Sequence, residues 1–256
     1  GTISKKSDPV TRLCYSDIDT IKVRGKDLCK ELVGKLTFTE MMLFHLTGKP
    51  PTKQQTAIVD AVLVTIMEHG LTPSAIAARQ TLFGAPEALQ GAVAAGILGV
   101  GTRFAGTSGD CAELLAEIVA ATGDRKGEVA LAIAERHRIQ KKPVPGYGHP
   151  VHKNGDPRVA RLVEIARQNG AGGHYIDAMY MLGDAVNAAI GKTVVINASA
   201  AMGAAMAEVG IPPGIMRGLI IVSRAAGLVG HLLEEMREPA SQKIWDLVES
   251  GVPYRE

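Results

Sequence analysis

The stretch that decides how this sequence folds is Pro143-Val-Pro-Gly-Tyr-Gly-His-Pro-Val-His-Lys-Asn-Gly-Asp-Pro-Arg158. Its prolines and glycines exclude a regular helix and predict a loop. The backbone of such a loop can approach a flat ligand closely, because glycine has no side chain to cover its peptide groups. His149 lies in the middle, directly before Pro150, and Lys153 follows. One imidazole beside cationic side chains predicts an anionic ligand and acid–base chemistry at this loop.

Two plainer interpretations of the loop stay open. It is a rigid connector that carries a surface histidine, or it is a metal site built on His149 and His152. The spacing of the two histidines suits a helix, but Pro150 disfavours a helix here and no third ligand is near in the sequence. We therefore expect no metal.

The composition of the whole chain indicates a helical protein. The chain has 256 residues, of which 46% are hydrophobic but only 4% are aromatic. Strands favour aromatic and β-branched residues, so this composition favours helices. The length suits one large domain or two small ones. We expect an all-α fold with no strand ladder, in which Lys192–Ile196 is the only β-like run.

Apolar residues at helical spacing, closed by glycines, predict about ten helices. The helix at Ser199–Val209 is unusually rich in Ala and Gly, so a neighbouring helix can come close, either inside the chain or at a subunit interface. The expected helices lie in Leu32–Leu46, Gln54–Glu68, Pro73–Leu82, Ala85–Leu98, Cys111–Thr122, Glu128–Ile139, Arg158–Asn169, Tyr175–Ala189, Ser199–Val209, Pro213–Glu234 and Ser241–Ser250.

Charge and cysteine content exclude several classes of protein. The net charge of +2 is close to neutral and disfavours a nucleic-acid surface. Every apolar run of about 18 residues contains a charge or a helix breaker, so we expect no membrane span. The three cysteines form no CxxC pair, which excludes a disulfide scaffold or a zinc ribbon. The first nine residues have no apolar core of a signal peptide, so we expect a cytoplasmic protein.

The loop strongly resembles the central motif of the citrate synthase superfamily, and the short chain resembles citryl-CoA lyase, a compact type of member. Other segments match the superfamily in the same order along the chain. They are Val23-Arg24-Gly25 followed by Phe38-Thr39-Glu40 and Gly48–Thr52; Glu68-His69-Gly70 followed by Pro73-Ser74 and Ala77-Ala78-Arg79; Ala92–Gly101; and Ser223-Arg224-Ala225-Ala226-Gly227 followed by His231 and Glu234.

This resemblance implies a citrate synthase-like, all-α fold with two domains. The large helical domain would be residues 1–103 with 210–256, and the small one, residues 104–209, would carry the acyl-CoA loop. The protein would be a homodimer or a higher homo-oligomer that binds coenzyme A or an acyl-CoA and a carboxylate substrate, with no nucleic acid or membrane as partner. Its reaction would form or cleave a carbon–carbon bond next to a thioester.

The matching positions also imply roles for single side chains. His149 would move the proton on the oxygen at the carbon under attack, and His69 would hydrogen-bond a substrate carboxylate. Arg158 and Arg224 would clamp carboxylates, for which the planar guanidinium is well suited.

The loop would hold the coenzyme. The backbone of Val144, Pro145, Gly146, Tyr147 and Gly148 would receive the adenine, and Lys153 would reach a phosphate. The superfamily's remaining carboxylate-binding arginine comes from the partner subunit. Arg237, Lys243 and Arg255 are candidates for it, and Arg255 is favoured because it lies near the last residue and could reach across a dimer.

Two catalytic positions depart from the superfamily pattern. The histidine of a His-Gly-Gly-Ala turn falls on Phe104, or on Ala105 if the match slips by one, and the aspartate of an Asn-x-Asp motif falls on Ser199. A serine hydroxyl is a weak base, and phenylalanine cannot donate a hydrogen bond to an oxyanion. Losing one such donor slows a reaction by about 100–1000-fold. We therefore expect ordinary acetyl-CoA condensation to be disabled.

Three functions stay open after these replacements. The first is a carbon–carbon lyase or synthase resembling citryl-CoA lyase, in which Ser199, Thr107, Ser108 or a water serves the enolate and Phe104 shapes a more apolar acyl pocket. The second is a catalytically silent acyl-CoA-binding or regulatory protein. The third is a helical scaffold, which the retained polar side chains of the motifs disfavour, because converging polar groups are costly without a ligand.

Overall fold

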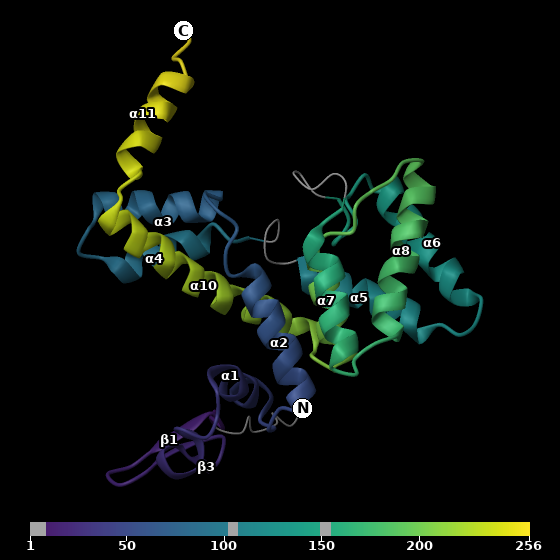
Figure 1. The fold of residues 1–256 in the computed structure, drawn as a ribbon, viewed down its shortest axis with the longest axis horizontal. Helices are drawn as coiled ribbons and strands as arrows, with labels where there is room; N and C mark the ends of the chain where they lie inside the picture. The colour runs from purple at the N-terminus through teal and green to yellow at the C-terminus, as the bar shows by residue number, and fades with distance from the viewer. Residues whose placement is uncertain (1–8, 102–106, 149–154) are drawn as a thin grey trace, which may run out of the picture. The chain divides into compact units, whose positions relative to one another are not determined.

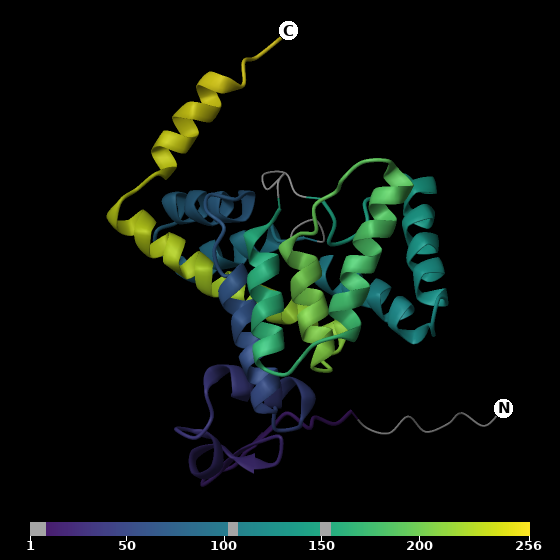
Figure 2. The same ribbon diagram turned by 45° about the vertical axis from the view of Figure 1, so that its right-hand side comes forward.

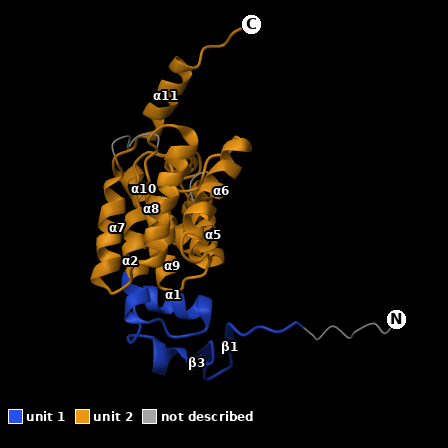
Figure 3. Ribbon diagram, turned by 90° about the vertical axis from the view of Figure 1, so that its right-hand side faces the viewer, with its two compact units in different colours: residues 1–57 blue, residues 58–256 orange. Residues whose placement is uncertain are grey.

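The computed structural model describes residues 9–101, 107–148 and 155–256, which divide into two compact units (Figure 3). Unit 1 is residues 1–57 and unit 2 is residues 58–256. Helices dominate both, which confirms the predicted fold class. The predicted large domain (1–103 with 210–256) and small domain (104–209) follow a different division of the chain and stay a prediction.

Unit 1 contains a small sheet that corrects the expectation of no strand ladder. Strands β1 (Cys14–Ser16), β2 (Ile21–Val23) and β3 (Lys26–Asp27) pair antiparallel in this order. Arg24 and Gly25 join β2 to β3, with φ of 51° and 81°. Two such residues make the tight turn whose twist suits a hairpin. The strands have three residues or fewer, too short for an alternating pattern to show in the sequence.

The remainder of unit 1 surrounds a small apolar core. A π-helical turn, η1 (Leu28–Leu32), precedes α1 (Phe38–Thr47), and α2 (Lys53–Ile66) runs on into unit 2. Helix α1 starts later than predicted, because Thr37 and Glu40 form a reciprocal capping box at its N-terminus. Val23, Leu32 and Phe44 form the core.

Unit 2 is entirely helical in its regular structure within the described ranges (Figure 1). Helices α3, α4 and α10 pack against one another, and α9 lies among α5, α7, α8 and α10. Their bounds are α3 (Pro73–Gly84), α4 (Leu89–Leu98), α5 (Thr107–Ala120), α6 (Arg125–Ile139), α7 (Pro157–Gln168), α8 (His174–Ile190), α9 (Ala198–Glu208), α10 (Pro213–Arg237) and α11 (Ser241–Gly251).

The small residues of α9 serve packing inside the chain, which decides between the two alternatives left open by the sequence. Residues 200–206 are all buried. A Cβ on Gly203 would lie 2.4 Å from the carbonyl oxygen of Ser108, so only glycine lets α5 come this close. Glu208 at the end of α9 accepts hydrogen bonds from the first amides of α8, those of Gly173, Tyr175 and Ile176. These contacts make α9 the central helix of its group.

Helices α10 and α11 end the chain and differ in how much of their surface is covered. Helix α10 packs against α3, α4, α5 and α9, while α11 contacts α3 and extends outward from the end of α10 in both views (Figures 1 and 2). By length and composition alone, α10 could also cross a membrane, a criterion that the core helices of other proteins meet as well. Trp245 and Val248 of α11 are about half exposed, at 53% and 55%.

Candidate active site

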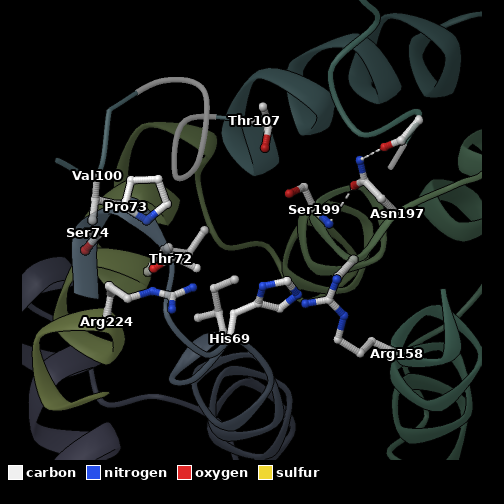
Figure 4. Close-up of a pocket in the computed structure, with 14 residues that line it drawn as sticks. His69, Thr72, Pro73, Ser74, Val100, Thr107, Arg158, Asn197, Ser199 and Arg224 are labelled. Carbon is white, nitrogen blue, oxygen red and sulfur yellow. Dashed lines mark hydrogen bonds between the residues drawn. The ribbon is translucent and has the colours of Figure 1, made fainter. Parts of the chain in front are cut away.

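The candidate site is a pocket of about 460 Å³ in unit 2, built from the ends of several helices. His69 and Thr72 come from the connection after α2, and Arg224 comes from the middle of α10 (Figure 4). The complete lining is Ile66, His69, Thr72, Pro73, Ser74, Val100, Thr107, Gly148, Arg158, Asn197, Ala198, Ser199, Ile220 and Arg224.

The polar side of the pocket is arranged to receive negative charge. Figure 4 shows the imidazole of His69 between the guanidinium groups of Arg224 and Arg158. The first turns of α5 and α9 also reach the lining through Thr107 and Ser199. The first amides of α9, those of Ala198 and Ser199, already donate to Asp156 and Asn197, so this end of the helix offers the pocket the positive end of its dipole. Two guanidinium groups and the start of α9 suit a ligand with carboxylates.

The surroundings of Arg224 lower the pKa of its guanidinium group. Burial lowers this pKa, Glu68 raises it, and the like charge of Arg158 lowers it again, so that it lies below the ordinary value. An anionic ligand between the two arginines would offset the cost of burying the charge of Arg224 and would weaken its repulsion by Arg158. The pair of carboxylate-binding arginines predicted from the sequence therefore lies in one pocket.

Arg158 is held in position by the buried carboxylate of Asp156. The Nε and Nη2 of Arg158 donate to the two oxygens of Asp156, at 2.9 and 2.8 Å. Asp156 also accepts from the amide of Ala198, at 2.9 Å, and caps α7. Burial raises the pKa of Asp156, but the hydrogen bonds from Arg158 and Ala198 outweigh it and hold the pKa below its ordinary value. One carboxylate thereby aligns α7, α9 and Arg158.

The described part of the predicted coenzyme loop, Pro143–Gly148, is fixed against the residues before α9. Gly148 donates to the carbonyl of Val195 at 2.6 Å, and Asn197 donates through its amide nitrogen and its side chain to Gly146 and Gly148. Gly146 has φ of 90°, and a Cβ there would lie 2.7 Å from that of Ala200. Among the described residues, the β-like run predicted at Lys192–Ile196 forms one isolated bridge, between Tyr147 and Ile196.

Tyr147 and Val144 of the same loop are buried, and the Tyr147 hydroxyl donates to the carbonyl of Met179 at 2.7 Å. Burial raises the pKa of this tyrosine well above its ordinary value. Pro145 is half-buried between them. Several peptide groups of the loop already bond within the chain, so an adenine would meet the remaining ones. The predicted adenine contact stays a prediction.

Ser199 lies in the pocket, at the position where the superfamily pattern has an aspartate. Its amide donates to the side chain of Asn197, the residue that caps α9, at 2.9 Å. Thr107 lines the pocket as well. The hydroxyl of Ser108 is instead buried without a hydrogen-bond partner among the described residues. Of the hydroxyl groups predicted to serve an enolate, Ser199 and Thr107 are therefore the two in the lining.

The other predicted site residues fall elsewhere. His149, His152, Lys153 and Phe104 lie outside the described residues. Arg255 is exposed beyond α11 and does not line this chain's pocket. Within the described ranges, no cluster of three His, Cys, Asp or Glu side chains could hold a metal ion.

The sequence alone did not identify several residues that shape the site. Thr72 caps α3 and lines the pocket, and its position directly before Pro73 is a helix-start signal that could have placed it. Asp156 lies inside the quoted motif, and Asp followed by Pro is likewise a helix-start signal. A signal for its contact with Ala198 is absent from the local sequence.

The comparisons with known proteins agree with the motifs. Residues 14–245 match the citrate synthase family, by its C-terminal domain. The citrate synthase of Synechocystis sp. is 28% identical over 208 residues, which are 79% of this chain and 50% of the relative. The 2-methylcitrate synthase of Shewanella oneidensis is 27% identical over 198 residues, 75% of this chain and 50% of that protein. The chain spans about half the length of these curated relatives.

Solved structures extend the likeness to the whole chain. The structure of citryl-CoA lyase from Hydrogenobacter thermophilus has a TM-score of 0.81 and 31% identity, covering 98% of this chain and 97% of that chain. ATP citrate lyase from Methanothrix soehngenii, in complex with citrate and coenzyme A, has a TM-score of 0.75 and 20% identity. It covers 99% of this chain and 42% of that chain, and it shows a likeness of fold.

The chain therefore belongs to the citrate synthase family. Within that family, it is similar over nearly its full length to the citryl-CoA lyase of Hydrogenobacter thermophilus. The predicted citrate synthase-like fold is confirmed.

Proposed function

We propose that this protein is an acyl-CoA-dependent carbon–carbon lyase or synthase that resembles citryl-CoA lyase. Its substrate would be a 3-hydroxyacyl-CoA such as citryl-CoA, and its products acetyl-CoA and a keto acid, or the reverse. The observation that carries the proposal is the pocket in which His69, Arg158 and Arg224 meet the first turns of α5 and α9. Such a site suits the carboxylates of citryl-CoA, and the likeness to a citryl-CoA lyase over 98% of the chain supports the same substrate.

Cleavage needs a base at one end of the broken bond and a proton donor at the other. His149 would take the proton of the 3-hydroxyl group, and the carbon–carbon bond would then break to leave the keto acid. The electron pair would pass into the thioester as an enolate, which needs a proton on carbon to become acetyl-CoA. A hydroxyl or a water beside it can deliver that proton, so Ser199 and Thr107 suit this half of the reaction.

The catalytically silent alternative is favoured by one observation. Ser199 occupies the pocket at the position of the superfamily's aspartate, and a serine cannot take a proton from the methyl group of acetyl-CoA. The protein would then bind an acyl-CoA as a sensor or a regulatory partner. Both functions predict that the protein binds an acyl-CoA, but only the lyase or synthase predicts that the thioester is consumed.

Incubation with citryl-CoA and related thioesters, followed by mass spectrometry of the coenzyme A products, tests the proposal. We expect acetyl-CoA to appear with the wild type. The His149→Ala variant should lose turnover, while coenzyme A still raises its melting temperature. A rise in melting temperature without consumption of any thioester would favour the silent binder, and no response to coenzyme A would contradict both functions.

The Ser199→Asp variant separates the two directions of the reaction. An aspartate at the start of α9 is stabilised by the helix dipole and can act as a base. We expect it to exchange the methyl protons of acetyl-CoA with deuterated water at least 10-fold faster than the wild type, as one general base contributes about 10²–10⁴-fold. Ser199→Asn is the matched control, because it has the same shape without the charge.

We also propose that the protein is a cytoplasmic homodimer. Trp245 and Val248 share one face of α11, Val252 follows directly after the helix, and all three are at least half exposed. A second copy of the chain is the occupant that the family resemblance implies for this apolar face. Arg255 lies a few residues after this face in the sequence and would reach the pocket of the partner.

A further inference from the structure

One face of α10 contacts the end of α2 and the connection that carries His69. The Ser223 hydroxyl donates to the carbonyl of Leu63 at 2.5 Å. A Cβ on Gly227 would lie 2.0 Å from the carbonyl oxygen of Met67, so the two backbones touch there. His231 is the next residue on this face, because side chains four positions apart lie above one another on a helix.

His231 contacts Glu68, whose carboxylate holds the backbone at His69. The Nε2 of His231 lies 3.0 Å from Oε1 of Glu68. The same oxygen accepts from the amides of His69, at 2.8 Å, and Gly70, at 2.5 Å. Burial raises the pKa of Glu68, but the hydrogen bonds from Gly70 and His231 outweigh it, so the pKa lies below its ordinary value. Glu68 is therefore a charged acceptor at neutral pH.

Arg79 fixes the orientation of the His231 ring. Its Nε and Nη2 lie 3.1 and 3.0 Å from Nδ1 of His231. A guanidinium only donates, so Nδ1 is the acceptor and the ring proton is on Nε2, directed at Glu68. Arg79 is 1% exposed and is itself held by ion pairs with Glu234 and Glu235. The ring is thus oriented by a buried group that the pocket does not use.

We propose that His231 is a positioning residue, which, oriented by Arg79, holds the Glu68 carboxylate on the amides of His69 and Gly70 and so presents the His69 imidazole to the substrate carboxylate. The proposal rests on the proposed function for the role of His69. The chain of contacts itself, from Arg79 to the amide of His69, depends only on the geometry. His231 acts through other groups and does not line the pocket.

Two substitutions of His231 separate its hydrogen bonds. In His231→Asn, the amide oxygen can replace Nδ1 as acceptor for Arg79, but the side chain is too short to reach Glu68. In His231→Gln, the amide nitrogen reaches the place of Nε2 and can donate to Glu68. Ile133→Val, in the buried side of α6, is the control for general destabilisation, since it removes one methyl group far from the connection.

The test combines amide hydrogen exchange of His69 and Gly70 by NMR with the KM for citryl-CoA and the Kd for coenzyme A. His231→Asn should raise both exchange rates and should raise KM about 10–100-fold through misplacement of His69, with Kd unchanged. His231→Gln and Ile133→Val should stay close to the wild type. Wild-type exchange rates and KM in His231→Asn, or equal losses in the Asn and Gln variants, would overturn the proposal.

Two further arms keep the outcome decisive. If His231→Asn does not fold, Glu68→Ala removes the acceptor from a side chain that is 54% exposed, and the exchange of the His69 and Gly70 amides should rise in the same way. If the wild type consumes no thioester, the proposed function fails. The exchange rates then decide the positioning role by themselves, because they require no substrate.

Discussion

Asp156 connects three parts of the pocket through a single carboxylate. Its side chain is fully buried, and it binds the guanidinium of Arg158 and the first amide of α9 while it caps α7. Removing one partner of a buried ion pair is expensive, because the other partner keeps its charge without compensation. The stability of the helix ends around the pocket should therefore depend on this charge.

We expect Asp156→Asn to lower the free energy of unfolding by about 3 kcal/mol at pH 7. Asparagine still caps a helix, so the variant mainly removes the charge. Folding lowers the pKa of Asp156. The contribution of its charge to the free energy of unfolding is therefore complete above the unfolded pKa of about 4 and is lost as the pH falls through the lower pKa of the folded state. Urea unfolding of both proteins between pH 7 and pH 3 should show the difference narrowing below pH 4. A constant difference would contradict this assignment.

Single residues also show where sequence reasoning reached its limit. His69, Arg158, Arg224 and Ser199 could be named from motif order, and the structure brings them into one pocket. The contact of Arg79 with His231 joins residues that are 152 positions apart. Residue spacing along a helix carries no information on such a contact. The contacts that support His69 can therefore be identified only from the folded structure.

At the scale of elements, α10 combines an arginine for the pocket with a face that supports the His69 connection. The face works because Gly227 lets the backbone of α10 touch that of Met67. Gly218 lies on the same helix with nothing within 4 Å of the position of a Cβ. Both glycines lie in the same helix, and only Gly227 is in close contact with another part of the chain. Gly218 is therefore a suitable control for Gly227.

We expect Gly227→Ala to lower the free energy of unfolding by about 2–3 kcal/mol, because the new methyl group overlaps a carbonyl oxygen. Gly218→Ala should instead raise it by about 0.5–1 kcal/mol, the usual gain of alanine over glycine in a helix. Thermal unfolding followed by circular dichroism measures both changes. Equal shifts of the two melting temperatures would show that the close approach has no energetic role.

The spacing of apolar residues locates most helices, but it places their first and last residues less accurately. Helix α4 begins at Leu89, later than the predicted Ala85, because an irregular turn around Pro86 and Glu87 precedes it. The hairpin in unit 1 was missed because each strand is too short for a period of two to show. Local patterns thus predict long elements well and short ones poorly.

At the scale of the whole molecule, the exposed apolar face of α11 carries the prediction of a dimer. Trp245 and Val248 lie on this face, and Lys243 lies on the opposite one. Light scattering after size exclusion should give twice the mass of one chain for the wild type. Trp245→Glu combined with Val248→Glu should give a single chain, because two charges would be buried in an apolar contact.

Lys243→Glu is the control for the dimer, since it changes a charge on the side of α11 away from Trp245 and Val248 and should leave the mass unchanged. A monomeric wild type would contradict the proposed dimer. A dimer that survives both glutamates would place the contact elsewhere on the chain.

Glu235 gives the network beneath the pocket a second attachment. It binds Arg79 and also accepts hydrogen bonds from the amides of Ala240 and Ser241, where α11 begins. A mutation at this one position would therefore loosen both the terminal helix and the support of the pocket. During evolution, selection that keeps the start of α11 in place would therefore also keep Arg79 in place, and the reverse. We expect descendants of this sequence to retain or lose both contacts of Glu235 together.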